Sequence, residues 1–253
     1  MSLFKIFWNA WLKNSFVKSF MFISIFTLLF FNIFVITTEK DLFYSLGGSF
    51  KIPQVLNLFF AINFHFVYLI PILLTYIAGI NDHNGSFLRY IYLSGYGKDK
   101  IFYFFQRSII FMSLIITFII LLVSLIVGFK EGFSPAGIHL QDLIWPIIFF
   151  IQSFAIGNFL FLILLLSRSV LKTILITVFL SFILEPILYY IAKDYFDYFS
   201  YFPFRTINNL SYVQGMTFTI SASPDRGLNL IFALIYLIVC YFINLNLFRK
   251  INI

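Results

Sequence analysis

The sequence NDHNGSFLRYIYLSGYGKDKIFYFFQR, residues 81–107, lies between two long apolar runs and carries six charged side chains. Ser86 is a typical residue to begin a helix, and seven residues of mixed apolar and polar character follow it. Gly95 and Gly97 come next, and glycine commonly ends helices. The pattern predicts a helix of about two turns over residues 87–93, tied to a turn. A plain basic loop is the alternative.

The composition of the whole chain is far more apolar than that of a soluble protein. Hydrophobic residues make up 61% of its 253 residues, and charged residues make up 11%. Soluble globular domains contain about 45–50% apolar and about 25% charged residues. We therefore expect an integral membrane protein.

Six apolar runs approach or exceed the length of about 20 residues that a membrane-spanning helix needs. They are residues 19–37, 55–80, 108–129, 143–166, 173–192 and 228–247. Residues 1–18 combine Trp8 and Trp11 with lysines at a helical spacing, which favours an amphipathic interfacial helix over a basic tail. No connection has room for a soluble domain, so residues 1–253 are predicted to form one all-α transmembrane domain.

The basic residues predict the orientation of the six spans. Eleven of the 17 Lys and Arg residues lie in four pieces, residues 1–18, 81–107, 167–172 and 248–253. Lys and Arg are enriched in the cytoplasmic loops of membrane proteins. We therefore expect a multi-pass protein of the cell (cytoplasmic or inner) membrane, with both termini and residues 81–107 in the cytoplasm.

The stretch 81–107 resembles the segment between the second and third spans of the type-2 exporter permeases of ATP-binding cassette transporters. The resemblance rests on Asp82, on Asn84-Gly85-Ser86, on the run from Leu93 to Lys98 (LSGYGK) and on Arg107. Glu in place of Asp82 and Lys in place of Arg107 are more frequent in that family. The six spans, the cytoplasmic ends and the first amphipathic helix also match the family's plan.

The resemblance implies that the short helix is a coupling helix, which inserts into a cleft of a cytoplasmic ATPase subunit. The residues implied in this contact are Asp82, Gly85, Ser86, Phe87, Leu88, Arg89, Tyr90, Leu93, Gly95 and Arg107. It also implies a second permease copy, identical or related, as a partner within the lipid bilayer. The cargo expected from such an apolar chain is a lipid, an amphipathic peptide or a hydrophobic drug.

Glu185 precedes Pro186 inside the fifth apolar run. A carboxylate within a membrane segment is a functional candidate, while the proline can break the helix. If the fifth span ends here, residues 187–204 would form a re-entrant segment before the last span. Glu185, Asn57 and Asn63 are therefore candidates for a substrate path. Alternatively, Glu185 satisfies backbone groups freed by Pro186, lines an outer vestibule or couples transport to protons.

Catalytic function is not indicated by any pattern in the chain. There is no P-loop pattern, so ATP and Mg²⁺ would bind to the partner ATPase. His65 falls within a predicted span, His83 on the cytoplasmic side and His139 on the outer side. The three histidines therefore cannot share a metal in this topology. We expect no catalytic residue, no cofactor or metal bound by this chain, and no nucleic-acid partner. A membrane-embedded immunity or assembly protein and a six-span membrane enzyme are the alternative functions.

Overall fold

The computed structural model describes three stretches, residues 92–130, 144–184 and 226–250, and a few separate positions. Those positions are Ser19, Phe22, Ile23, Phe26, Leu29, Phe30 and Ile187. The chain divides into two compact units. The first comprises Met1–Phe66 and Leu114–Phe150, and the second comprises Val67–Ser113 and Ile151–Ile253. The contacts described below all lie within the second unit.

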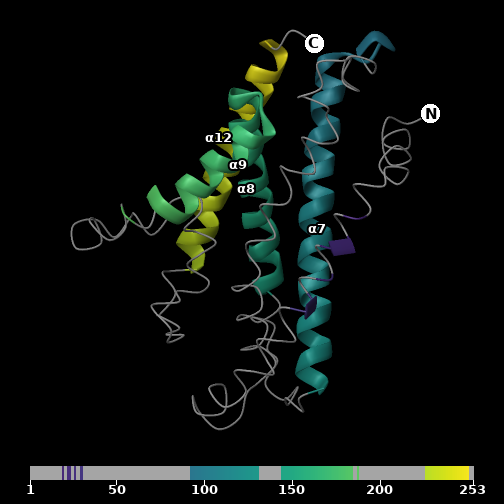
Figure 1. The fold of residues 1–253 in the computed structure, drawn as a ribbon, viewed down its shortest axis with the longest axis vertical. Helices are drawn as coiled ribbons and strands as arrows, with labels where there is room; N and C mark the ends of the chain where they lie inside the picture. Colours follow the sequence, from purple (N-terminus) through teal and green to yellow (C-terminus); the bar gives the residue numbers. More distant parts are fainter. Residues whose placement is uncertain are drawn as a thin grey trace. The chain divides into compact units, whose positions relative to one another are not determined.

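Every regular element in the described stretches is helical (Figure 1). The elements are α7 (Lys98–Lys130), α8 (Ile144–Ser167), α9 (Val170–Val178), the π-helix η2 (Phe179–Leu184) and α12 (Arg226–Lys250). Three segments are long and apolar enough to cross a membrane, namely Lys98–Leu122, Phe149–Ser167 and Leu230–Lys250. This agrees with the prediction of a multi-pass, all-helical membrane protein.

Helix boundaries match the predicted spans unevenly. The fourth and sixth runs, 143–166 and 228–247, correspond closely to α8 and α12. The third, 108–129, is too short, because α7 already begins at Lys98 and no glycine or proline interrupts residues 98–107. Arg107 therefore lies well inside α7, and not at a boundary between the segment and the span as we expected.

Other predicted elements fall largely outside the described residues. These are the interfacial helix 1–18, the spans 19–37 and 55–80 apart from the separate positions, the end of the span 173–192, and the segment 187–204 apart from Ile187. Glu185 and Pro186 also lie outside them. The π-helix η2 ends at Leu184, directly before this pair. Since proline donates no backbone hydrogen bond, an altered helical pattern is expected upstream of Pro186.

In α9 the two threonine side chains are buried and several apolar side chains are exposed, which is the reverse of a helix in a soluble protein. Thr173 and Thr177 are buried, whereas Leu171, Leu175 and Ile176 are exposed. The hydroxyl groups of Ser167 and Thr173 are 2.8 Å apart, and the Thr173 hydroxyl also donates to the backbone oxygen of Ser169. Polar groups turned inward and apolar groups turned outward are the arrangement that surrounding lipid requires.

Four phenylalanines hold three helices together at one level of the second unit. Phe102 and Phe105 of α7 pack against Phe161 of α8 and Phe248 of α12, with ring centroids 5.3–6.5 Å apart. All four side chains are at least 95% buried. We call this set the aromatic layer. Offset and edge-on ring contacts of this kind are favourable beyond the area that they bury.

The aromatic layer also shows the relative directions of α7, α8 and α12. Phe102 belongs to the second turn of α7, whereas Phe161 and Phe248 lie near the ends of α8 and α12. The beginning of α7 therefore lies beside the ends of the other two helices. The predicted topology requires this, because it places residues 81–107, 167–172 and 248–253 on one side of the membrane.

Replacement of Phe161 by Ala is expected to lower the free energy of unfolding by about 3–5 kcal/mol, because it leaves a cavity among three rings. Titration of the purified protein with a denaturing detergent, followed by circular dichroism, measures this change. Phe242→Ala on α12 is the matched control, because that ring is 57% exposed, and its effect should be much smaller. Equal effects of the two substitutions would contradict the packing described.

Candidate functional site

The described part of the segment 81–107 begins with the end of a helix. Tyr92 and Leu93 are helical, and Ser94 and Gly95 form a turn in which the Gly95 N–H donates to the Tyr92 oxygen at 3.0 Å. Gly95 has a φ of 86°, in the left-handed region that glycine enters without strain. Tyr92 and Leu93 are thus followed by a turn at Gly95, where the sequence predicts the helix to stop, while residues 87–91 lie outside the described residues.

Two residues later the chain enters α7 with no further connection. The Gly97 oxygen accepts a hydrogen bond from the Ile101 N–H at 3.2 Å, so the helical ladder starts at that glycine. Asp99 lies in the first turn, where a negative charge compensates the positive end of the helix dipole. The turn thus connects the segment directly to a helix of 33 residues.

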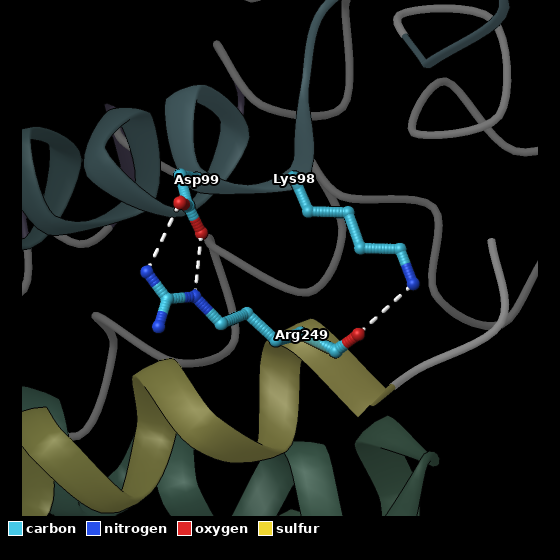
Figure 2. A network of polar contacts seen from close by, with 3 residues as sticks. All are labelled: Lys98, Asp99 and Arg249. Carbon is cyan, nitrogen blue, oxygen red and sulfur yellow. Dashed lines mark hydrogen bonds and ion pairs between the residues drawn. The ribbon is translucent and has the colours of Figure 1, made fainter.

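Three charged residues join the start of α7 to the end of α12 (Figure 2). The Arg249 guanidinium donates from Nε to Asp99 Oδ1 at 2.8 Å and from Nη2 to Oδ2 at 3.0 Å. Lys98 Nζ donates to the backbone oxygen of Arg249 at 3.0 Å. We call Lys98, Asp99 and Arg249 the charged clamp. Two parallel hydrogen bonds fix the geometry of a guanidinium–carboxylate pair more strictly than one.

The electrostatics of the charged clamp favour its position at these helix ends. Arg249 and the ammonium group of Lys98 lie at the carboxyl end of α12, where the helix dipole is negative. Asp99 lies at the amino end of α7, where the dipole is positive. The side chains of Asp99 and Arg249 are each 51% exposed, so solvent screening weakens their attraction. The charged clamp therefore contributes alignment more than stability.

Beneath the charged clamp α12 has further contacts with α7 and with α8. Tyr241 of α12 meets the Phe102 ring edge-on at a centroid distance of 5.4 Å. One turn deeper than the aromatic layer, Asn244 Nδ2 of α12 donates to the Asn158 oxygen of α8 at 2.9 Å. Motion of the first turns of α7 is therefore resisted by α12 through charge and ring packing. The buried hydrogen bond fixes α12 to α8.

The predicted site residues are only partly covered by the described stretches. Leu93 is 75% exposed, Gly95 forms the turn, and Arg107 is exposed on α7. Those outside the described stretches are Asp82, Gly85, Ser86, Phe87, Leu88, Arg89, Tyr90, Asn57, Asn63 and Glu185. Nothing in the described residues brings Arg107 into contact with Leu93 or Gly95.

Sequence reasoning missed the charged clamp and the buried amides. Arg249 was assigned only to topology and Asp99 only to a loop, since no sequence pattern pairs residues 150 positions apart. A signal for the amides was present, because Asn158 and Asn244 interrupt apolar runs, where polar residues usually face protein. Among the residues that the structure describes, no group of three His, Cys, Asp or Glu could hold a metal ion.

Comparison of the sequence with protein-family models finds no match. A search of curated proteins finds no match either.

Replacement of Gly95 by Ala is expected to lower the free energy of unfolding by about 1 kcal/mol, because an L side chain is strained in the left-handed region. No atom lies within 4 Å of the position that a Cβ would take, so the loss comes from the backbone and not from a clash. Gly95→Asn is the control, because Asn enters this region more readily and should recover part of the loss. Chemical unfolding measures both variants, and equal losses would exclude the backbone as the cause.

Proposed function

We propose that this chain is the membrane-spanning permease subunit of an ATP-binding cassette exporter, with residues 81–97 as its contact to a cytoplasmic ATPase subunit. The observation that carries the proposal is the turn at Gly95, which leads directly into a membrane helix whose first turn is held by the charged clamp. A force applied before the turn would reach that helix after two further residues, Tyr96 and Gly97.

The proposed coupling path has three steps. ATP binding in the partner closes the ATPase pair and displaces residues 87–93. The turn passes this displacement to the first turn of α7, where Asp99 is bonded to Arg249 of α12. The aromatic layer then passes it to α8 through Phe161. The helices shift as a group, and the cargo path opens.

The exposed side chains before the turn suit a protein partner. Leu93 is 75% exposed and Tyr92 is also exposed, immediately before the turn. On the cytoplasmic side of a membrane, exposed apolar side chains next to polar backbone are typical of a docking surface. In the proposal they are the last residues of the helix that enters the ATPase cleft.

The other parts of the proposal follow the expected topology. The chain has six spans in the cell membrane, with both ends in the cytoplasm, and it pairs with a second permease copy. ATP and Mg²⁺ are bound by the ATPase subunits. The cargo is a lipid, an amphipathic peptide or a hydrophobic drug, in keeping with the many exposed apolar side chains on α9 and α12.

Purification of the tagged chain from its own membranes in mild detergent is expected to recover an ATPase subunit with a P-loop, together with ATP hydrolysis. Leu93→Ser should lower this recovery about tenfold, because it removes an apolar anchor from the contact. Mass spectrometry and ATPase assays of the purified fraction provide the measurement.

Leu175→Ser is the matched control for that experiment. Leu175 lies on α9, is 60% exposed and should face lipid, so the substitution should leave ATPase recovery unchanged. Failure to recover any P-loop ATPase, or equal recovery from both variants, would contradict the proposed contact.

Substitution of the charged clamp tests the coupling path itself. Asp99→Arg and Arg249→Asp are each expected to lower the ATPase rate of the complex, because each places like charges beside one another. The double variant should recover the rate only in part, since its swapped charges oppose both helix dipoles. Lys100→Glu, in the same turn of α7, controls for a change of charge alone. A double variant no better than either single variant would refute the role of the pair.

A further inference from the structure

Three buried amide side chains lie beside the aromatic layer, on its side away from the charged clamp. Gln106 is four residues after Phe102 in α7, and Asn244 is four residues before Phe248 in α12. We call Gln106, Asn158 and Asn244 the amide layer. The exposed fractions of these residues are 5%, 0% and 0%.

The geometry of the helices brings these three residues to one level. Asn158 precedes Phe161 of α8 by three residues, and its backbone oxygen accepts the hydrogen bond from Asn244. Because α7 runs opposite to α8 and α12, residues that follow Phe102 in α7 lie at the level of residues that precede Phe161 in α8 and Phe248 in α12. At a rise of about 1.5 Å per residue, Asn158 lies about 4.5 Å beyond Phe161 and Asn244 about 6 Å beyond Phe248. Gln106 lies about 6 Å beyond Phe102 and directly follows Phe105.

Several hydrogen-bonding groups of the amide layer have no partner among the described residues. In the described residues, neither Gln106 Oε1 nor Gln106 Nε2 has a partner, and the same holds for Asn158 Oδ1 and Asn244 Oδ1. The amide nitrogens of the two asparagines are satisfied, by the Phe154 oxygen and the Asn158 oxygen. Buried polar groups are nearly always bonded, and the middle of a membrane offers no bulk water to replace a partner.

The unmatched atoms define what would bind there. Three oxygens require donors, and one amide nitrogen requires an acceptor, so the complementary group both donates and accepts. Gln106, Asn158 and Asn244 carry no charge, and the neighbouring Arg107 is exposed. An ion buried among the three amides would therefore lose its hydration without a buried counter-charge. An uncharged amide or hydroxyl group satisfies both conditions.

We propose that Gln106, Asn158 and Asn244 form a binding site for an uncharged amide or hydroxyl group carried on an apolar molecule. The aromatic layer lies between this site and the charged clamp. The assignment of that molecule as cargo rests on the proposed exporter function, whereas the binding site itself does not.

Photolabelling of the full chain in lipid nanodiscs tests the site directly. One probe is a dodecanamide with a diazirine in its chain, and the other is the matching dodecane diazirine without the amide. Mass spectrometry locates the labelled residues. The amide probe is expected to label the turns around Gln106, Asn158 and Asn244 about fivefold more than the hydrocarbon probe, which corresponds to one net hydrogen bond.

Gln106→Met separates binding from structure. It removes both unmatched groups of Gln106 at nearly constant volume, so labelling by the amide probe should fall about fivefold. The thermal midpoint should stay the same or rise, because an unsatisfied buried group is replaced by an apolar one. Gln152→Met is the control, because Gln152 is also a buried glutamine but lies on α8. This variant should keep the labelling.

Three outcomes would overturn the proposal. Equal labelling by the two probes would mean that the layer binds only water or no ligand. A lower thermal midpoint in Gln106→Met with unchanged labelling would assign the amide to packing. Loss of labelling in Gln152→Met alone would place the site elsewhere on α8. Because photolabelling needs no ATPase, these outcomes are distinct from a failure of ATPase recovery.

Discussion

The contact among Phe102, Phe105, Phe161 and Phe248 is the constraint on which the described bundle depends. Lipid tails are as apolar as these rings, so moving a ring from lipid into protein gains little by the hydrophobic effect. What remains is close packing, which is favourable only when the rings fit one another. The fit of these rings therefore determines how far α7, α8 and α12 are shifted along one another.

The neighbours of the aromatic layer change in a regular way along the helices. Towards the helix ends lies the charged clamp, whose side chains of Asp99 and Arg249 are half exposed. In the other direction lie the buried amides, which carry no charge, while Arg107 at the same level of α7 is exposed. Removing a charge from water is costly, so ions are expected at exposed positions and neutral polar groups at buried ones. The rings lie between these two environments, with Arg249 directly after Phe248 and Gln106 directly after Phe105.

The apolar runs predicted the existence of α8 and α12 well, since a run of this length has few alternatives to a membrane helix. The start of α7 was harder, because Lys98, Asp99 and Lys100 suggested a loop although they are compatible with a first helical turn. Gly95 was recognisable, because few residues other than glycine adopt its backbone conformation.

The pairing of side chains across helices was beyond the reach of one sequence. Gln106 was grouped with the end of a cytoplasmic segment, and its burial becomes evident only once α7 is known to begin at Lys98. Asp99 and Arg249 each have a local explanation that does not require the other. Their contact depends on the packing of rings elsewhere on the same helices, and such packing leaves no periodic signal.

The separation of 150 residues between Asp99 and Arg249 bears on how the protein is made. A ribosome produces about 5–20 residues each second, so α7 leaves it many seconds before α12 is complete. During that interval the first turn of α7 has neither Arg249 nor the ring of Phe248 beside it. The charged clamp can close only after α12 has been synthesised, and its formation therefore marks a late step in assembly of the second unit.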